Sequence, residues 1–133
     1  MTLRPILFAL VLLAGCTTPG GASADPVRFA SMDDYQARRA TAMDLLTDAV
    51  GESRAGDASA CRALAVGAKA CGGPTQYVVF STTATDAAEA ERLAGAVTAL
   101  DRAANDQFGL VSTCEMLMEP AVALDGGRCV AAP

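Results

Sequence analysis

The sequence predicts an α+β domain with two main helices and a small antiparallel sheet, held together by two disulfides. Residues 31–54 and 86–108 repeat apolar side chains at helical spacing. A β-branched and aromatic run at residues 77–80 and an Asp-Gly-Gly turn at residues 125–127 indicate antiparallel strands. Four cysteines within the domain complete the pattern, because an even number in a small exported chain is typical of disulfides.

The first main helix is expected to begin at Ser31 and to end near Arg54, before Gly56. Ser31 is a good N-cap residue, and Asp33 and Asp34 in the first turn suit the positive end of the helix dipole. One face is apolar and is formed by Met32, Tyr35, Ala42, Met43, Leu46, Ala49 and Val50.

A short second helix is expected next, running through Cys61, Leu64 and Val66 after a cap at Asp57 or Ser59. The sequence GAKACGGP at residues 67–74 should end it, since glycines and a proline force a turn.

Residues 77–80, Tyr-Val-Val-Phe, predict a brief strand, and the second main helix follows it. Asp86 with Glu89 three residues later forms a capping-box pattern at the helix start. Phe108 is the last residue in register, and Gly109 suits the left-handed position after a helix. The apolar positions between these ends are Ala90, Leu93, Val97, Leu100 and Ala104.

The C-terminal part predicts a hairpin that turns at residues 125–127 between PAVAL and RCVAA. Four cysteines allow three pairings. Cys61 with Cys71 and Cys114 with Cys129 is the preferred pairing, because each pair brackets a turn-rich segment. Each short loop could stabilise the fold by up to about 3 kcal/mol in the chain-entropy model.

The N-terminal stretch MTLRPILFALVLLAGC has a basic start and an apolar run well below the ~20 residues that cross a bilayer as a helix, as in a secretory signal peptide. Leu13, Ala14 and Gly15 before Cys16 resemble the lipobox of bacterial lipoproteins. The resemblance implies that residues 1–15 are removed and that Cys16 carries a diacylglycerol and further acyl chains such as palmitate. An ordinary signal peptide with a chance cysteine is the alternative.

Several acyl chains would form a lasting membrane anchor. Thr17 after Cys16 resembles the pattern of lipoproteins that Gram-negative bacteria send to the outer membrane, so the expected location is the cell envelope, at the outer membrane and facing the periplasm. Residues 16–28 are small and polar with Pro and Gly, which indicates a flexible tether. Residues 29–133 then form one small domain.

Composition argues against several function classes. The chain has a net charge of −5 and no histidine. Nucleic-acid binding needs basic surfaces, so no nucleic-acid partner is expected. His-based triads are impossible, and no two cysteines have zinc-knuckle spacing, so no metal is expected. Asp33 and Asp34 point apart on a helix, and Glu115 with Glu119 is interpreted as solvated surface. The chain is therefore predicted to be no enzyme and to bind no cofactor.

Two loops are the expected contact surfaces, because loops on rigid scaffolds commonly carry binding residues. Lys69, the only lysine, lies in the first loop with Gly72 and Gly73. Asp125 and Arg128 flank the hairpin turn in the second. An exposed charge on a turn is the alternative interpretation of Lys69.

The order CRALAVGAKACGGPTQYVVFST, a helix, GLVSTC and PAVALDGGRC resembles small exported bacterial proteins without an assigned activity, over roughly residues 60–130. This resemblance implies a shared domain and nothing about chemistry. The predicted function is a non-catalytic, lipid-anchored binding or accessory module of the cell envelope, whose ligand is not specified; another envelope protein is a candidate partner. An inhibitor of an envelope hydrolase, such as a lysozyme or protease, is the alternative. An enzyme that acts through carboxylates alone is a third hypothesis.

Overall fold

The structure is a computed structural model that describes residues 26–132. The elements in chain order are α1 (Met32–Val50), the 3-10 turn η1 (Ala58–Ala60), β1 (Cys61–Val66), β2 (Gln76–Ser81), α2 (Ala87–Phe108), β3 (Val122–Asp125) and β4 (Arg128–Ala131). Two helices, two small antiparallel sheets and two disulfides confirm the predicted α+β class.

The predicted signal peptide, Cys16 and most of the predicted tether lie outside the described residues. Within residues 26–132, no helix has the length and apolar character needed to cross a membrane.

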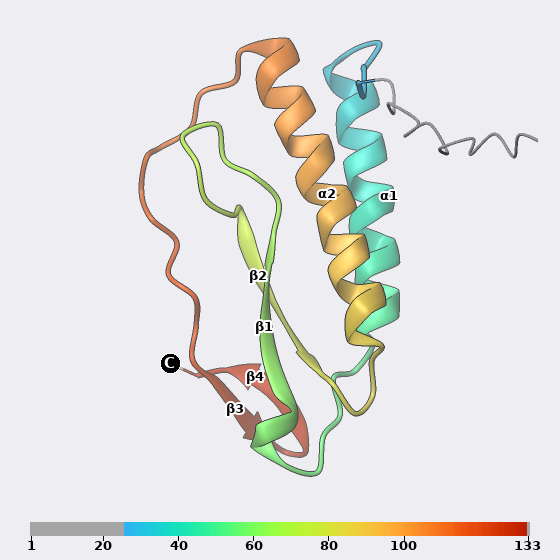
Figure 1. The fold of residues 1–133 in the computed structure, drawn as a ribbon, viewed down its shortest axis with the longest axis vertical. Coiled ribbons are helices and arrows are strands. Elements are labelled where there is room, and N and C mark those ends of the chain that lie inside the picture. The colour runs from blue at the N-terminus through green and yellow to red at the C-terminus, as the bar shows by residue number, and fades with distance from the viewer. Residues whose placement is uncertain (1–25, 133) are drawn as a thin grey trace, which may run out of the picture.

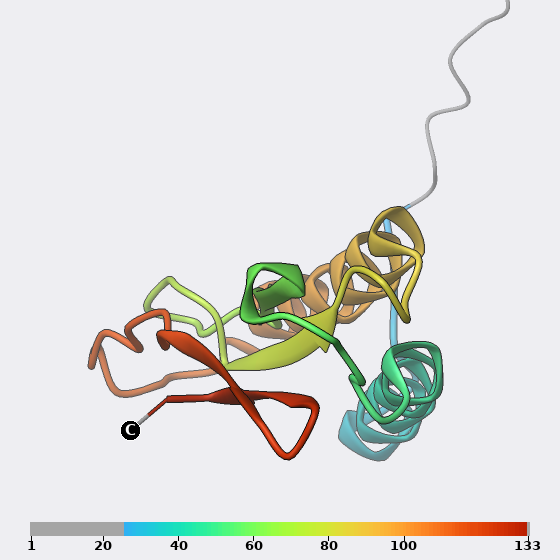
Figure 2. The same ribbon diagram turned by 90° about the horizontal axis from the view of Figure 1, so that it is seen from below.

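The two helices run antiparallel against one face of the β1–β2 hairpin, and the β3–β4 hairpin lies toward the opposite face (Figure 1, Figure 2). Alternate side chains of a strand share a face, so Leu64, Val66, Val78 and Phe80 all pack toward the helices. The buried core consists of Leu46, Val50, Val66, Phe80, Ala90, Leu93, Ala94 and Val97.

Residues 61–66 form a strand, so the short helix predicted there is wrong. Only η1 is helical, and Asp57 begins it by accepting a hydrogen bond from the Ser59 N–H. β1 pairs along its whole length with β2, from Cys61 opposite Ser81 to Val66 opposite Gln76. Alanine and leucine favour a helix in isolation, but β2 is rich in β-branched and aromatic residues and needs a hydrogen-bonded partner. Strand pairing therefore overrides the local preference.

Both long helices begin at their predicted caps. The Ser31 hydroxyl accepts a hydrogen bond from the backbone of the first turn of α1, and the Asp86 carboxylate accepts two at the start of α2, one of them from Glu89. α2 also ends as predicted, with Gly109 in the left-handed conformation at φ 58°.

α1 ends at Val50, one turn before the predicted Arg54. Gly51 leaves the helix at φ 56°, and the chain then joins the sheet. Arg54 forms a β-bridge with Arg128 of β4. The predicted end rested on Gly56 as the helix stop, but the backbone groups of Ser53 and Ala55 are paired with the C-terminal hairpin instead.

The disulfides differ from the predicted pairing: Cys61 bonds Cys129, and Cys71 bonds Cys114. The prediction assumed that Cys61 and Cys71 lie close together across a short turn. β1 is extended instead, and at about 3.3 Å per residue it carries the chain about 20 Å away from Cys61. Cys61 therefore meets β4, whereas Cys71 meets the chain after α2.

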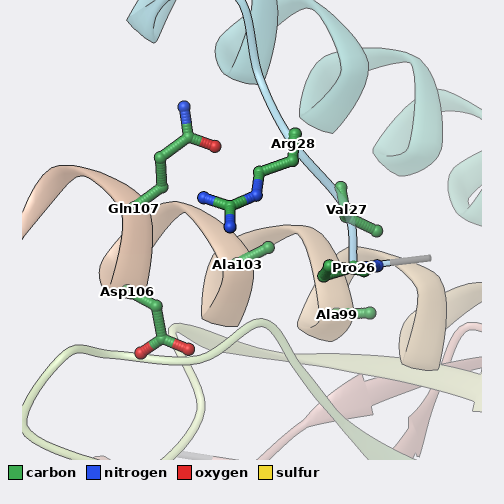
Figure 3. Close-up of a pocket in the computed structure, with 7 residues that line it drawn as sticks. All are labelled: Pro26, Val27, Arg28, Ala99, Ala103, Asp106 and Gln107. Carbon is green, nitrogen blue, oxygen red and sulfur yellow. The ribbon is translucent and has the colours of Figure 1, made fainter.

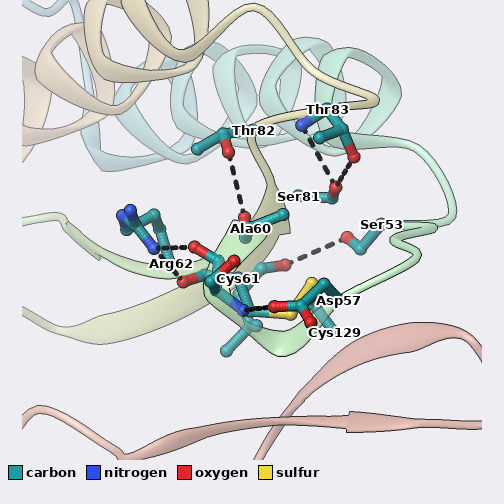
Figure 4. Close-up of a disulfide and its surroundings, with 11 residues drawn as sticks. Ser53, Asp57, Ala60, Cys61, Arg62, Ser81, Thr82, Thr83 and Cys129 are labelled. Carbon is teal, nitrogen blue, oxygen red and sulfur yellow. Dashed lines mark hydrogen bonds between the residues drawn. A yellow bond between two sulfur atoms is a disulfide. The ribbon is translucent and has the colours of Figure 1, made fainter.

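The Cys61–Cys129 disulfide is buried, with exposed fractions of 1% and 6% for its two residues. Figure 4 shows its surroundings, where Ser53 donates a hydrogen bond from its hydroxyl to the Val79 carbonyl at 3.1 Å. The Ser53 carbonyl accepts from the Cys129 N–H at 3.0 Å. These bonds hold Ser53 at φ 53°, a conformation uncommon for a residue other than glycine.

Candidate functional site

The loop between β1 and β2, residues 67–75, carries three of the five predicted contact residues, Lys69, Gly72 and Gly73. It projects from the end of the hairpin that lies away from β3 and β4 (Figure 1). Side-chain and backbone contacts fasten this 67–75 loop to α2 on one side and to residues 110–121 on the other.

Asp101 of α2 is the buried anchor of the loop, with only 3% of its side chain exposed. Its carboxylate accepts hydrogen bonds from Arg39 Nε at 2.8 Å and from the Tyr35 hydroxyl at 2.9 Å, both on α1. It also accepts one from the Ala68 N–H of the loop at 3.0 Å. One carboxylate therefore links both helices to the loop.

The two side chains that donate hydrogen bonds to Asp101, Tyr35 and Arg39, are both held in their protonated forms. Burial raises the pKa of Tyr35, and the hydrogen bond to Asp101 raises it further. Burial lowers the pKa of Arg39, but the hydrogen bond and the attraction to Asp101 outweigh this effect and leave that pKa above its usual value. A neutral tyrosine and a charged arginine thus compensate the buried carboxylate.

Gly67 begins the loop in a conformation that requires glycine. Its φ is 79°, and a Cβ there would overlap the Thr75 hydroxyl and lie 2.5 Å from Asp101 Oδ2. The Gly67 N–H donates to Thr98 Oγ1 at 3.1 Å. Close approach of the loop backbone to α2 is therefore possible only without a side chain at this position.

On its other side the loop is fastened to residues 110–121, called here the 110–121 segment. The Cys71–Cys114 disulfide joins the two, and both cysteines are exposed. The Cys71 N–H donates to the Ser112 hydroxyl at 3.1 Å, and Lys69 Nζ donates to the Glu115 carbonyl at 2.8 Å. The 67–75 loop is thus held in place covalently as well as by hydrogen bonds.

A cavity of about 420 Å³ lies between the 67–75 loop and α2. The three predicted contact residues Lys69, Gly72 and Gly73 line it, together with Pro74 of the loop. Thr98 and Arg102 contribute from α2. The structure therefore brings the loop residues together around one concave surface, which we call the loop cavity.

The hairpin tip, the second predicted contact surface, lies apart from the loop cavity. Arg128 donates to Glu52 at 3.0 Å, and Glu52 also accepts from Arg54 at 2.7 Å. These contacts attach the tip to the chain after α1, at the end of the molecule that holds the buried disulfide. Asp125 and Arg128 are exposed there and do not join Lys69, Gly72 and Gly73.

A second groove, of about 530 Å³, runs beside the N-terminal segment and α2 (Figure 3). Pro26, Val27 and Arg28 form one wall, and Ala103 with Gln107 belongs to the other. The wall at residues 26–28 continues into the part of the chain that is not described, so this groove carries no functional argument.

The carboxylate pairs considered from the sequence lie on the surface. Glu115 and Glu119 are exposed, as is Asp33. Asp34 accepts hydrogen bonds from the Ala30 N–H and from Arg38, and these lower its pKa. Among residues 26–132, no group of three or more His, Cys, Asp and Glu side chains is placed to hold a metal ion.

Sequence reasoning missed Arg102 and the Asp101–Arg39 pair. A signal was present for the pair, because Asp101 interrupts the buried stripe of α2 between Val97 and Ala104. A charged residue on an apolar stripe predicts a buried partner. No comparable signal marks Arg102, which lies on the exposed side of the same helix.

Comparison with known proteins assigns no family: no family model matches the chain, and no curated protein or solved structure matches it significantly.

Proposed function

We propose that this chain is a lipoprotein of the bacterial cell envelope, anchored through Cys16 at the outer membrane, and that its domain is a non-catalytic binding module. The anchor is supported by the sequence LAGC at residues 13–16 and by the apolar run before it. The binding role is supported by one observation above the others, the loop cavity with its rigidly held wall.

Rigidity matters because a ligand that meets a preformed surface pays no cost for ordering it. The 67–75 loop is fixed by the buried carboxylate of Asp101 beneath it and by the Cys71–Cys114 disulfide beside it. A loop with several glycines would otherwise lose much conformational freedom on binding.

The anchor is tested by Cys16→Ser in the full-length chain. We expect the variant to leave the membrane fraction or to accumulate as an uncleaved precursor, since no thiol is present to accept the diacylglycerol. Fractionation and intact mass measurement distinguish these results. A variant that keeps the mass and membrane association of the acylated protein would contradict the anchor.

The binding role is tested by cross-linking in envelope extracts, with mass spectrometry of the captured proteins. We expect one dominant partner for the wild-type chain and a strong loss for Lys69→Ala with Arg102→Ala. Arg92→Ala is the matched control, because it removes an exposed cation of α2 that lies outside the loop cavity. Equal capture of the partner by the wild-type chain, the double variant and the control variant would place the binding surface elsewhere. Capture at background level by all of them would contradict a protein partner.

The alternative, an inhibitor of an envelope hydrolase, is favoured by the 110–121 segment. This segment contains no helix or strand before β3, and Val111, Met116 and Met118 are 95%, 79% and 77% exposed. An exposed segment without helix or strand that is fixed by a disulfide loses little conformational freedom when it enters the active-site cleft of a hydrolase. A dose-dependent loss of lysozyme or protease activity that disappears in Cys71→Ala with Cys114→Ala would support inhibition, and unchanged activity would contradict it.

A further inference from the structure

We propose that the loop cavity binds a terminal carboxylate attached to a short aliphatic group. The inference rests on the proposed binding role and deepens it by naming the ligand chemistry. Lys69 and Arg102 would hold the carboxylate, and the alanine and proline side chains of the cavity would contact the aliphatic part.

The charge of the cavity is the first argument. Within residues 26–132, five arginines form ion pairs with carboxylates, namely Arg38, Arg39, Arg54, Arg92 and Arg128. Four other cations of this range, Arg28, Arg62, Lys69 and Arg102, form none, and of the charged residues that the structure describes only Lys69 and Arg102 line the cavity. Asp101 lies beneath the loop, but Arg39 already neutralises it. An acidic protein therefore keeps two uncompensated cations at one concave site.

Both cations retain donors for a ligand. Lys69 Nζ spends one hydrogen bond on the Glu115 carbonyl, and an ammonium group has three donors. The Arg102 guanidinium has five N–H donors in a planar fork, which matches the two oxygens of a carboxylate.

The loop backbone argues against a phosphate. Phosphate-binding loops direct a row of unpaired N–H groups at the anion. Here most of the amides are already used: those of Gly67, Ala68, Lys69, Cys71 and Gly72 donate to acceptors within the protein, so the loop offers no row of unpaired N–H groups. Recognition therefore rests mainly on the two side chains, and a singly charged carboxylate requires fewer donors than a phosphate.

The size and lining of the cavity complete the case. A volume of about 420 Å³ lies within the range of small-molecule sites. Ala65, Ala68, Ala70 and Pro74 also line the cavity and give it apolar surface. Such a surface suits methyl or methylene groups next to the carboxylate, as in an aliphatic acid or the C-terminal end of a peptide that finishes in a small residue.

The test is isothermal titration calorimetry of the full-length chain in a mild non-ionic detergent, at pH 7 and low ionic strength. The probes are N-acetyl-dialanine with a free carboxylate, the same peptide as its C-terminal amide, butyrate and inorganic phosphate. We expect saturable binding of the free acid, at least about tenfold tighter than the amide, because the amide lacks the charge. Butyrate that binds equally well identifies a free acid as the ligand, and weaker butyrate identifies a peptide end.

Variants locate the site. Lys69→Gln and Arg102→Gln should each weaken binding of the free acid about tenfold. Arg92→Gln is the matched control on α2, because Arg92 is exposed and pairs with Glu89 outside the cavity. Thermal melts verify that every variant is folded. Equal binding of acid and amide, tighter binding of phosphate, no saturable binding or unchanged affinity in both cavity variants would each overturn the proposal.

The result is separable from the binding role itself. If carboxylate binding fails while capture of an envelope partner still depends on Lys69 and Arg102, the ligand chemistry is wrong and the binding surface stands. If capture and carboxylate binding are both absent, the proposed function falls as well.

Discussion

At the scale of single residues, Asp101 connects the sequence of α2 to the shape of the loop cavity. A carboxylate with 3% exposure is costly to bury unless every acceptor is satisfied. Arg39, Tyr35 and Ala68 satisfy it from α1 and from the loop. The main effect of the Asp101–Arg39 pair is therefore to fix the position of the loop relative to both helices. Its net contribution to stability is the smaller effect.

We expect Asp101→Asn to lower the free energy of unfolding by about 2 kcal/mol. The variant leaves Arg39 without its counter-charge, which costs roughly 3–5 kcal/mol in a fully buried pair, and Arg39 is partly exposed so that solvent reduces the penalty. Urea denaturation measures the change. Asp106→Asn, on the exposed side of the same helix, is the control and should change stability little; a similar loss in both variants would contradict the role of Asp101.

Two glycines provide an opposed pair of predictions. Gly67→Ala should destabilise the fold by more than about 1 kcal/mol. The backbone φ of Gly67 is 79°, and the new Cβ would overlap side-chain atoms of Thr75 and Asp101. Gly95→Ala should stabilise it by about 0.5–1 kcal/mol, because Gly95 lies within α2 and, apart from the neighbouring helix backbone, nothing lies within 4 Å of the new Cβ. Thermal unfolding of both variants checks the signs, and equal signs would contradict the explanation.

At the scale of elements, the two disulfides have different surroundings and different tasks. Cys61–Cys129 ties β1 to β4 inside the protein, and Cys71–Cys114 ties the 67–75 loop to the 110–121 segment at the surface. Their sequence separations of 68 and 43 residues close long loops. In the chain-entropy model each one stabilises the fold by about 4 kcal/mol, more than the short loops first expected.

Mild reduction under native conditions should therefore open Cys71–Cys114 before Cys61–Cys129. Thiol–disulfide exchange requires that a thiolate reach one of the bonded sulfur atoms. Cys71 and Cys114 are exposed, whereas Cys61 and Cys129 are buried. Brief dithiothreitol treatment, alkylation and peptide mapping measure the order, and the fully denatured chain, in which both bonds are accessible, is the control. Labelling of Cys61 and Cys129 first would contradict the burial argument.

At the scale of the whole molecule, acidic side chains on the surface make stability depend on pH. Hydrogen bonds from Arg54, Ser59 and Arg92 lower the pKa values of Glu52, Asp57 and Glu89 respectively. A carboxylate whose pKa is lower in the folded state stabilises the fold above its unfolded pKa and loses that effect as pH falls through the folded pKa.

We accordingly expect the unfolding temperature to fall as pH drops below about 4.5, the ordinary pKa of glutamate.

The sign is opposite for Tyr35, because its pKa is raised in the folded state. Its contribution to stability is present below its ordinary pKa of 10.0 and is lost at higher pH. Thermal melts across the pH range measure the decrease of the unfolding temperature at low pH and at high pH. Tyr35→Phe should reduce the decrease at high pH and leave the decrease at low pH unchanged. An unchanged decrease at high pH would contradict the assignment to Tyr35.

Features that depend on neighbouring residues along the chain could be predicted from the amino-acid sequence. Caps at Ser31 and Asp86, the stop at Gly109, the strand at residues 77–80 and the turn at residues 125–127 are each specified within a few residues. For the same reason Lys69, Gly72 and Gly73, which are predicted contact residues, were recognisable as parts of one loop. The even count of cysteines within the domain indicated two disulfides without indicating their partners.

Features that depend on residues distant in the chain could be read only from the folded protein. CRALAV became a strand because β2 offered it hydrogen-bond partners, and that extended strand separated Cys61 from Cys71 and changed both disulfides. Arg39 and Asp101 are 62 residues apart, and Arg102 lines the same cavity as Lys69 because α2 packs beside the loop. Local propensities differ by less than about 1 kcal/mol per residue, so strand pairing and burial outweigh them wherever the two disagree.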